Sequence, residues 1–499
     1  MPEGMPGKSS VPHPTGKPYI PNKLYGGWQM EKIYWGEIHT HTYCGGSKFG
    51  DIEQAVKVAK THLDFWAPGE HYNERNTGVH PMFDWDKISR TVADNNEDGR
   101  FVAFPGMEFV GEQGDYNVYF NRDFISLDER ITNYERLFSF AGKNNAIVIP
   151  HHTGYKVGCR GMQWDWFDPS IMPAVEIFSM HGSSEDDNGC LPMNLPWMGP
   201  RETGGTAVAG LKRGKIFGFL ASSDGHSAYP GAYKMGLTAV YAERLDRQSV
   251  WNAILNRKTY AVTGDRILLD FKVNGNPMGT FFSSEDKPSF EARAECLDAI
   301  EKLEVIKNGS EIIKDCYIAS HKSEEEFMFR IEWGWGGEYK WEGAVSVEQG
   351  EIIDAVPCFG PPGNNVITGR GKGRVSFSSF TDGKTLFDWK TGRYDREGTN
   401  SLVLKIKGGR GVSLTVSVNG KQFSRRANDL SENSHVELLQ GPNGPKIKFH
   451  KIVYRQNYAR SFSWTDDSES TNLPVDFYYL RLTQKNGQMV WSSPIWIKK

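Results

Sequence analysis

The chain has 499 residues, enough for about two to four domains. Its 58 Lys and Arg residues nearly balance its 61 Asp and Glu residues, and no block of Lys or Arg indicates a nucleic-acid surface. No apolar run approaches the length that spans a membrane. The six cysteines include no Cys-x-x-Cys pair and are too sparse for a disulfide scaffold.

Residues 1–30 lack the apolar core of a signal peptide and predict a disordered lead-in. We therefore expect a cytoplasmic protein, although trimming of a secretory signal would leave the same sequence. Aromatic residues make up 13% of the chain, with 15 tryptophans, which allows sizeable cores and hints at stacking surfaces for sugar rings. The composition leaves the oligomeric state open.

Between residues 31 and 262, short apolar runs alternate with helical patterns. Residues 51–62 carry apolar or small side chains at 52, 55, 56 and 59, which is helical spacing, and residues 249–260 form a second such pattern. The strand-like runs are 63–71, 100–109, 145–152, 174–181, 216–226 and 237–243. Strands that alternate with helices predict a parallel sheet, open or closed into a barrel.

The character of the chain changes at about residue 266. From there to residue 499, short runs with alternating polarity dominate, and Asn308-Gly309, Asn419-Gly420 and Asn486-Gly487 separate some of them, as hairpins require. This half predicts an antiparallel β-sandwich region of one or two modules. Residues 31–265 predict a separate α/β domain.

Polar side chains follow the strand-like runs of the first half. His39 and His41 come first, and side chains two residues apart point the same way from a strand. The other run ends carry Glu70, His71, Glu108, His151, His152, His181, Asp224 and His226. In a parallel barrel such ends converge on one face, so these imidazoles and carboxylates predict a metal centre. The alternative is a set of separate, hydrogen-bonded structural histidines.

The order of these motifs resembles the PHP superfamily, named for polymerase and histidinol phosphatase domains. The matching motifs are "EIHTHT", "APGEH", "GMEF", "IPHH", "MHG" and "SSDGH", over about residues 31–265. A closer resemblance is to its PHP-like branch, the domain-of-unknown-function family 3604. In that branch "GSSD-x-H" recurs, as does the "WSSPIW" that stands here at 491–496. The resemblance implies a distorted (β/α)7 barrel, followed here by the antiparallel β-sandwich domains.

The resemblance also implies ligands for up to three metals. They are His39, His41, Glu108 and Asp224 for the first; Glu108, as a bridge, with His151 and His181 for the second; and His71 with His226 for the third. Glu70 stands where the family has an aspartate, and we keep it among the expected ligands. Ser47 stands where three-metal members have a histidine. We therefore predict two tightly held divalent ions (Zn, Mn or Fe) and a weak third.

Two neighbours of these residues leave alternatives open. Adjacent strand residues point to opposite faces, so only one of His151 and His152 should enter the site, and the family resemblance favours His151. Glu37 shares a face with His39 and either orients that imidazole or is an ordinary strand residue.

The predicted function is metal-dependent hydrolysis, most simply of a phosphoester by a metal-activated hydroxide. The expected catalytic residues are Glu108, Asp224, His226 and His71. The alternatives are hydrolysis of a C–N, C–O or glycosidic bond in a glycan-related substrate, or a non-catalytic metal-containing binding protein. We expect a small-molecule or oligosaccharide-type substrate. The candidate substrate contacts follow the His151 run and are Arg160, Lys156 and Tyr155. The guanidinium of Arg160 could donate two parallel hydrogen bonds to a phosphate or carboxylate.

Overall fold

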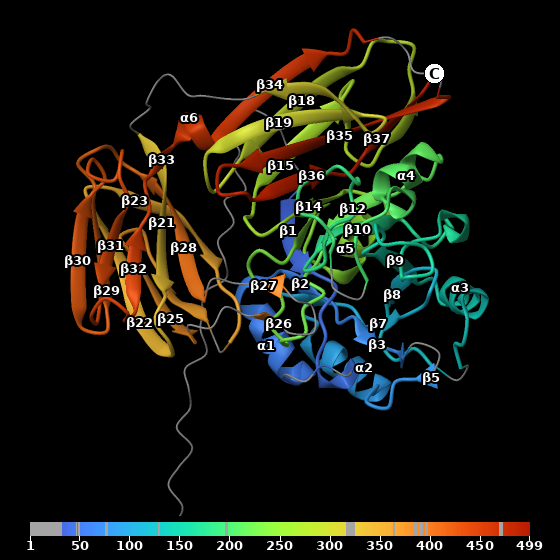
Figure 1. Ribbon diagram of the computed structural model, residues 1–499, viewed down its shortest axis with the longest axis horizontal. Coiled ribbons are helices and arrows are strands. Elements are labelled where there is room, and N and C mark those ends of the chain that lie inside the picture. The colour runs from blue at the N-terminus through green and yellow to red at the C-terminus, as the bar shows by residue number, and fades with distance from the viewer. Residues whose placement is uncertain are drawn as a thin grey trace, which may run out of the picture.

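Strands dominate the architecture, with 43% strand against 14% helix, in a mixed α/β fold of many sheets (Figure 1). The computed structural model describes residues 32–45, 47, 50–74, 78–127, 130–194, 198–315, 325–362, 365–382, 387–388, 393–394, 398–468 and 473–499. The predicted lead-in at 1–30 lies outside these residues. No helix among the described residues is long and apolar enough to cross a membrane.

The helices lie mainly in the first half of the chain. They are α1 (Ile52–His62), α2 (Trp85–Asn95), α3 (Tyr134–Lys143), α4 (Ala207–Lys212), α5 (Arg247–Leu255) and α6 (Arg455–Tyr458). The helix predicted over 51–62 is α1, which Asp51 caps by accepting a hydrogen bond from the Gln54 backbone at 2.8 Å. The pattern predicted over 249–260 ends earlier, at Leu255, because Thr259 already begins a strand.

The strands of the first half fall into several sheets. They are β1 (Lys32–Glu37), β2 (Phe65–Trp66), β3 (Glu70–His71), β4 (Asn73–Glu74), β5 (Gly78–Val79), β6 (Val102–Ala103), β7 (Gly106–Phe109), β8 (Asp115–Tyr119), β9 (Ile147–His151), β10 (Ala174–Ser179), β11 (Gly182–Ser183), β12 (Gly218–Ala221), β13 (Leu237–Ala242) and β14 (Thr259–Val262). The pairs β1–β2, β2–β6, β3–β7 and β10–β12 are parallel, as the alternating pattern predicts.

These strands do not form one closed barrel within the described residues. Their ladders belong to four separate sheets, and β8 pairs antiparallel with both β7 and β9. The expected strand–helix alternation fails at this point because β8 enters between two of the predicted runs without a helix before it. The coarse prediction of an α/β region is confirmed, whereas the closed barrel is not found.

The second half contains mostly antiparallel strands. They are β15 (Leu268–Val273), β16 (Asn276–Pro277), β17 (Phe281–Ser283), β18 (Ser289–Glu295), β19 (Ile300–Lys307), β20 (Ser310–Asp315), β21 (Glu326–Gly334), β22 (Tyr339–Glu348), β23 (Glu351–Cys358), β24 (Val366–Arg370), β25 (Arg374–Thr381), β26 (Phe387–Asp388), β27 (Arg393–Tyr394), β28 (Thr399–Lys407), β29 (Ser413–Val418), β30 (Lys421–Arg426), β31 (His435–Leu438), β32 (Lys446–Phe449), β33 (Val453–Tyr454), β34 (Ala459–Thr465), β35 (Val475–Gln484), β36 (Met489–Ser492) and β37 (Ile495–Lys498).

Two antiparallel sheets of this half share one hydrophobic core. One has the order β23-β28-β21-β32-β31 and the other β24-β25-β22-β29-β30. Trp333, Trp341 and Phe377 belong to the buried cluster that both sheets supply. The predicted Asn-Gly hairpin at 419–420 joins β29 to β30, with Asn419 at φ +47° and Gly420 at φ +79°.

The large sheet crosses the domain boundary predicted at residue 265. β14 pairs with β36, which pairs with β35, so the C-terminal strands lie in the same sheet as β1 and β13 (Figure 1). Buried Glu185 adds a second link, since it accepts hydrogen bonds at 2.8 Å from Tyr479, Arg481 and Trp491. The chain therefore returns from the β-rich half to complete the sheet that carries the first histidines.

Asp265 anchors the junction between the two halves. This buried carboxylate receives Arg330 Nη2 at 3.0 Å on both oxygens, and also hydrogen bonds from Tyr233, Gln484 and Asn486 at 2.7–2.9 Å. Burial alone would raise the pKa of Asp265, but Arg330 and these donors lower it below its ordinary value. The residue thus stays charged and holds β21 and the end of β35 beside the first half.

Replacing Asp265 with Ala should lower the free energy of unfolding by about 3–5 kcal/mol, because Arg330 would stay buried without its carboxylate. Denaturant unfolding at neutral pH measures this loss. Asp467→Ala is the control, since Asp467 pairs with Lys287 between side chains that are 73% and 71% exposed. That control should cost less than about 1 kcal/mol. Equal losses in the two variants would contradict the role of Asp265 as an anchor.

Candidate metal centre

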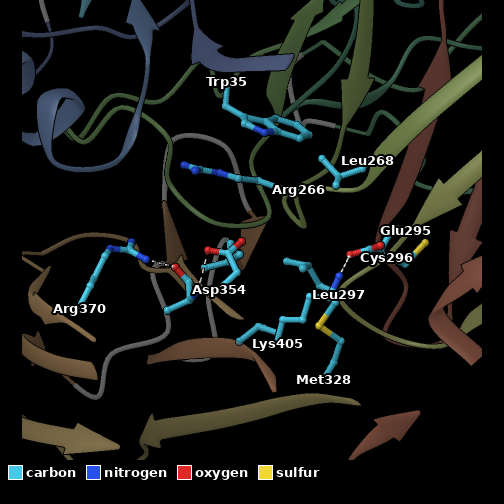
Figure 2. A pocket seen from close by; sticks show the side chains of 13 residues that line it. Trp35, Arg266, Leu268, Glu295, Cys296, Leu297, Met328, Asp354, Arg370 and Lys405 are labelled. Carbon is cyan, nitrogen blue, oxygen red and sulfur yellow. Dashed lines mark hydrogen bonds and ion pairs between the residues drawn. The ribbon is translucent and has the colours of Figure 1, made fainter. Parts of the chain in front are cut away.

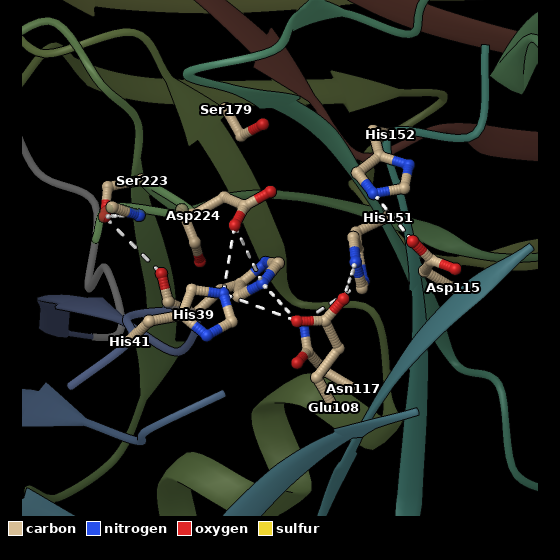
Figure 3. A network of polar contacts seen from close by, with 12 residues as sticks. His39, His41, Glu108, Asp115, Asn117, His151, His152, Ser179, Ser223 and Asp224 are labelled. Atoms are coloured by element: carbon tan, nitrogen blue, oxygen red, sulfur yellow. Dashed lines mark hydrogen bonds and ion pairs between the residues drawn. The ribbon is translucent and has the colours of Figure 1, made fainter. Parts of the chain in front are cut away.

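The histidines after β1 meet the Asp224 loop through backbone pairing. His41 N donates to Gly225 O at 2.9 Å, and Asp224 N donates to His39 O at 2.9 Å. Asp224 has φ +52°, a left-handed conformation that this pairing holds in place. Two segments 185 residues apart in sequence, as 39 and 224 are, therefore present their side chains to one point (Figure 3).

The first group of side chains joins these histidines to Glu108, which lies on β7. His41 Nε2 lies 3.0 Å from Asp224 Oδ1 and 3.3 Å from Glu108 Oε2. His39 Nε2 lies 3.4 Å from the same Asp224 oxygen and 3.8 Å from Glu108 Oε2. The four residues predicted as ligands of a first metal are thus gathered around one centre (Figure 3).

Glu108 also faces a second set of histidines. Its Oε1 lies 3.1 Å from His151 Nε2, while its Oε2 serves the first group. Asp224 divides its oxygens in the same way, because Oδ2 lies 2.9 Å from His181 Nε2. Each carboxylate therefore links two groups, as a bridging ligand must.

A third group lies at the more open edge of the cluster. Potential ligand atoms of His41, His71 and His226 lie within 4.8 Å of one another. His71 Nε2 also lies 3.0 Å from Glu108 Oε2, and its side chain is 25% exposed. Ser47 does not replace the family's histidine as a ligand here, because its hydroxyl donates to the His226 carbonyl at 2.6 Å. His41 instead completes the group.

Partners at Nδ1 orient several of these imidazoles. His39 Nδ1 lies 3.1 Å from Glu176, His181 Nδ1 lies 3.1 Å from the Tyr155 hydroxyl, and His226 Nδ1 lies 3.0 Å from the Asp224 carbonyl. His151 Nδ1 lies 3.2 Å from the Asn117 amide. Such contacts fix the ring orientation and leave Nε2 for the centre, an arrangement common around metal ligands.

The donor set fits divalent cations. His39 Nε2 and Glu108 Oε2 are buried and make no hydrogen bond within the described structure, so a bound cation would satisfy them. Burial would raise the pKa of Glu108, but His71 and His151 lower it well below its ordinary value. Burial lowers the pKa of His226 to about 4 and that of His41 well below its ordinary value, whereas nearby carboxylates, against the effect of burial, raise the pKa of His39 and of His71. A cation that binds there must therefore displace the protons of His39 and His71. Anionic oxygens and neutral imidazoles are the ligands that Zn, Mn and Fe accept.

Two further residues, His152 and Asp115, belong to the cluster. Strand alternation predicts that His152 points away from it, and no sequence motif indicates Asp115. His152 Nε2 lies 3.1 Å from Asp115 Oδ2, and His152 also groups with His181 and Asp224. The prediction that only His151 enters the site is wrong, because β9 ends at His151 and His152 has φ +33°, which reverses its side-chain direction. Asp115 could have been found from the alternating polar residues of "DYNVY".

Two carboxylates near the motifs face elsewhere. Glu70 belongs to none of the possible ligand groups among the described residues. It precedes His71 on β3 and so points to the opposite face, where it accepts the Thr42 backbone N–H at 2.9 Å. Glu37 does not orient His39, because its carboxylate accepts the Ser223 backbone N–H at 2.8 Å. The carboxylate beside the His39 ring is that of Glu176.

The predicted substrate contacts lie in different settings. Arg160, at φ +71°, directs Nε and Nη2 onto Asp115, and its Nη2 lies 3.5 Å from Glu108 Oε1. Its side chain is 19% exposed, so it borders the cluster on the solvent side. Lys156 is exposed. Tyr155 is buried, and it contacts His181 instead of an open surface.

Comparison with known proteins gives partial likenesses. The family model described as "Protein of unknown function (DUF3604)" matches residues 226–286, which include His226 but none of the other clustered residues. An uncharacterized protein of Chlamydia pneumoniae is 27% identical over 325 residues, which cover 59% of this chain and 50% of that protein. An uncharacterized protein of Chlamydia trachomatis is 23% identical over 491 residues, or 93% of this chain and 57% of that protein. The chain thus spans about half the length of these relatives.

A comparison with solved structures also gives a weak likeness. The solved structure is a two-domain protein from Bacteroides vulgatus that contains a predicted PHP-like metal-dependent phosphoesterase. The likeness covers 79% of this chain and 95% of that one, with 14% sequence identity and a TM-score of 0.36. A likeness with a TM-score of this size supports no conclusion about the function of the present chain.

Replacing Glu108 with Gln should lower the bound metal to less than about half of the wild-type content, since a bridging carboxylate serves two groups. Plasma mass spectrometry after dialysis measures the content. Glu332→Gln is the matched control: Glu332 holds His450 at 2.7 Å in the β-rich half and should leave the metal content unchanged. Full metal retention by Glu108→Gln would show that Glu108 is not a shared ligand.

Proposed function

We propose that the protein is a metal-dependent hydrolase that cleaves phosphoesters at the Glu108 centre. One observation carries the proposal: each of the two buried carboxylates, Glu108 and Asp224, faces histidines of two different groups with its two oxygens. A structural metal site is usually a closed cage of four ligands. Shared ligands with an open edge instead suit a multinuclear centre that admits a substrate.

Divalent ions bound there would supply positive charge to a scissile oxygen and lower the pKa of a water molecule. The chain's own residues bind and orient. His71 and His226 border the exposed edge, so a substrate would approach from their side. Glu176, Asn117 and Tyr155 hold the imidazoles in place from behind, which keeps the donors preorganised.

Arg160 favours a phosphoester among the possible substrates. Its guanidinium borders the cluster and keeps part of its surface exposed, and a planar fork of N–H donors matches the oxygens of a phosphate. Asp115 holds the guanidinium in that position. Because Nε and Nη2 point to Asp115, Nη1 is the nitrogen that remains for a non-bridging oxygen beside the metal ligands.

The proposal also includes membership of the PHP superfamily, a distorted barrel with a β-sandwich region, and Zn, Mn or Fe as the bound metal. We propose two tightly held ions and a weaker third, with His41, His71 and His226 as the group for the third. The substrate would be a small phosphorylated molecule that enters at the His71 edge.

No observation favours the glycan-related alternative. Tryptophans that would stack on sugar rings must be exposed. Eight of the 15 tryptophans are instead buried, namely Trp35, Trp66, Trp164, Trp251, Trp333, Trp341, Trp491 and Trp496. The aromatic composition thus reflects packing at these positions.

The metal-loaded protein should hydrolyse chromogenic phosphoesters, and Glu108→Gln should lower kcat/KM by at least about 100-fold. A parallel screen of phosphomonoesters, phosphodiesters, carboxyl esters, amides and glycosides measures both. His450→Ala is the control, because His450 lies in the β-rich half and should not affect turnover. Hydrolysis of an amide or glycoside with no phosphoester turnover would overturn the proposal.

Replacing Arg160 with Gln should raise KM for a phosphoester about 10-fold or more, with a smaller effect on kcat, because a charge-assisted contact to the substrate is lost. Steady-state kinetics separates the two constants. Lys156→Gln is the neighbouring control, since Lys156 is exposed on the same loop. If both variants behave alike, Arg160 has no specific role in binding.

A further inference from the structure

A cavity of about 60 Å³ lies between the first half and the β-rich half, apart from the Glu108 centre (Figure 2). Trp35 lines it from the first half, Arg266 from the start of the β-rich half, and Asp354 and Arg370 from β23 and β24. Lys405 and the segment that carries Glu295 complete the wall. Arg370 is exposed and marks the side from which a solute would enter.

One lysine of the wall is already neutralised. Lys405 Nζ lies 2.5 Å from Glu295 and 3.3 Å from Glu326. The remaining charged groups are Arg266, Arg370 and Asp354, so two guanidinium groups face one carboxylate. The side chains that line the cavity therefore carry one positive charge in excess, but Glu326 beside Lys405 and Asp64 near Arg266 offset it from behind the wall, so free guanidinium donors rather than a net charge distinguish the cavity.

The guanidinium groups of Arg266 and Arg370 have more N–H donors than hydrogen bonds among the described residues. Arg266 donates to the His62 carbonyl and lies 6.0 Å from the Trp35 ring centre (Figure 2). Arg370 Nη1 donates to the Ala355 carbonyl at 2.6 Å. These are the hydrogen bonds of the two guanidinium groups within the described structure, and each group carries five N–H donors. Neither group has a paired carboxylate within salt-bridge distance among the described residues.

Arg330 shows what a fully paired arginine looks like in the same protein. It binds both oxygens of Asp265 at 3.0 Å, and although burial opposes the charge, Asp265 raises its pKa. By contrast, burial lowers the pKa of Arg266 and of Arg370. Asp64 and Asp354 oppose this effect at Arg266, and Asp354 opposes it at Arg370, so nearby carboxylates compensate the two charges in part.

We propose that this cavity binds one small oxyanion of the size of inorganic phosphate, held between Arg266 and Arg370. Its volume has room for about four water-sized atoms, which suits a free tetrahedral oxyanion and excludes a nucleotide. The anion would occupy the free N–H donors of the two guanidinium groups. Because residues of both halves line the cavity, the bound anion would also hold the halves together.

The site is independent of the proposed hydrolase activity but is connected to it along the chain. Trp35 lies on β1, four residues before His39, and Arg266 follows the anchor Asp265 directly. Phosphate could also bind at the metal centre, so the test must separate the two sites. Variants in the cavity wall do this, since they leave the Glu108 cluster untouched.

Calorimetric titration of the metal-loaded protein with inorganic phosphate, at constant ionic strength, tests the proposal. In Arg370→Gln the affinity of one phosphate site should fall about tenfold or more, because a charged hydrogen-bond partner is lost. In Asp354→Asn it should rise severalfold, because a competing negative charge is removed. Arg266→Gln should weaken binding as well, with circular dichroism to check that this more buried variant folds.

Arg425→Gln is the matched control, since Arg425 pairs with Glu437 far from the cavity wall. Its phosphate affinity should equal that of the wild type, and the metal content of all four variants should be unchanged. If phosphate binds equally well to the wild type, Arg370→Gln and Asp354→Asn, it binds only at the metal centre and the proposal is wrong. Absence of phosphate binding at millimolar concentration would overturn it equally.

Discussion

The burial of the Glu108 and Asp224 carboxylates is the constraint on which the rest of the structure depends. An ionised carboxylate in a protein interior costs several kcal/mol unless nearby groups compensate it. Here the compensation comes from imidazoles on several strand ends and from Arg160. The chain must therefore bring these ends together.

The second requirement is that the strands carrying these residues stay in register. β1 receives this support from β13 and, through β14, from the C-terminal strands β35 and β36. Asp265 and Glu185 tie the same regions through buried hydrogen bonds and ion pairs. The β-rich half thus contributes to the metal centre by supporting the sheet from which His39 and His41 project, without supplying a ligand among its described residues.

The two charged regions of the protein differ in how they are balanced. At the Glu108 centre negative and positive groups are interleaved, and the unsatisfied atoms are a carboxylate oxygen and imidazole nitrogens, which suits cations. At the cavity between the halves Arg266 and Arg370 each make one hydrogen bond among the described residues and keep further N–H donors, which suits an anion. The ligand expected at each site thus follows from the donors and acceptors that its side chains leave available.

Local sequence determined the residue types of the centre, the helix over 51–62 and the Asn-Gly turns, because capping, turn chemistry and periodicity act over a few residues. Spacing also placed His39, His41, Glu108 and Asp224 at strand ends. Tertiary structure alone decided that β8 runs antiparallel and that β36 closes onto β14, since strand pairing across hundreds of residues depends on the packing of the whole chain. Tertiary structure also placed His152, Asp115 and Glu176 beside the candidate metal ligands. A positive φ at His152 and long-range contacts override the alternation that a single strand would impose.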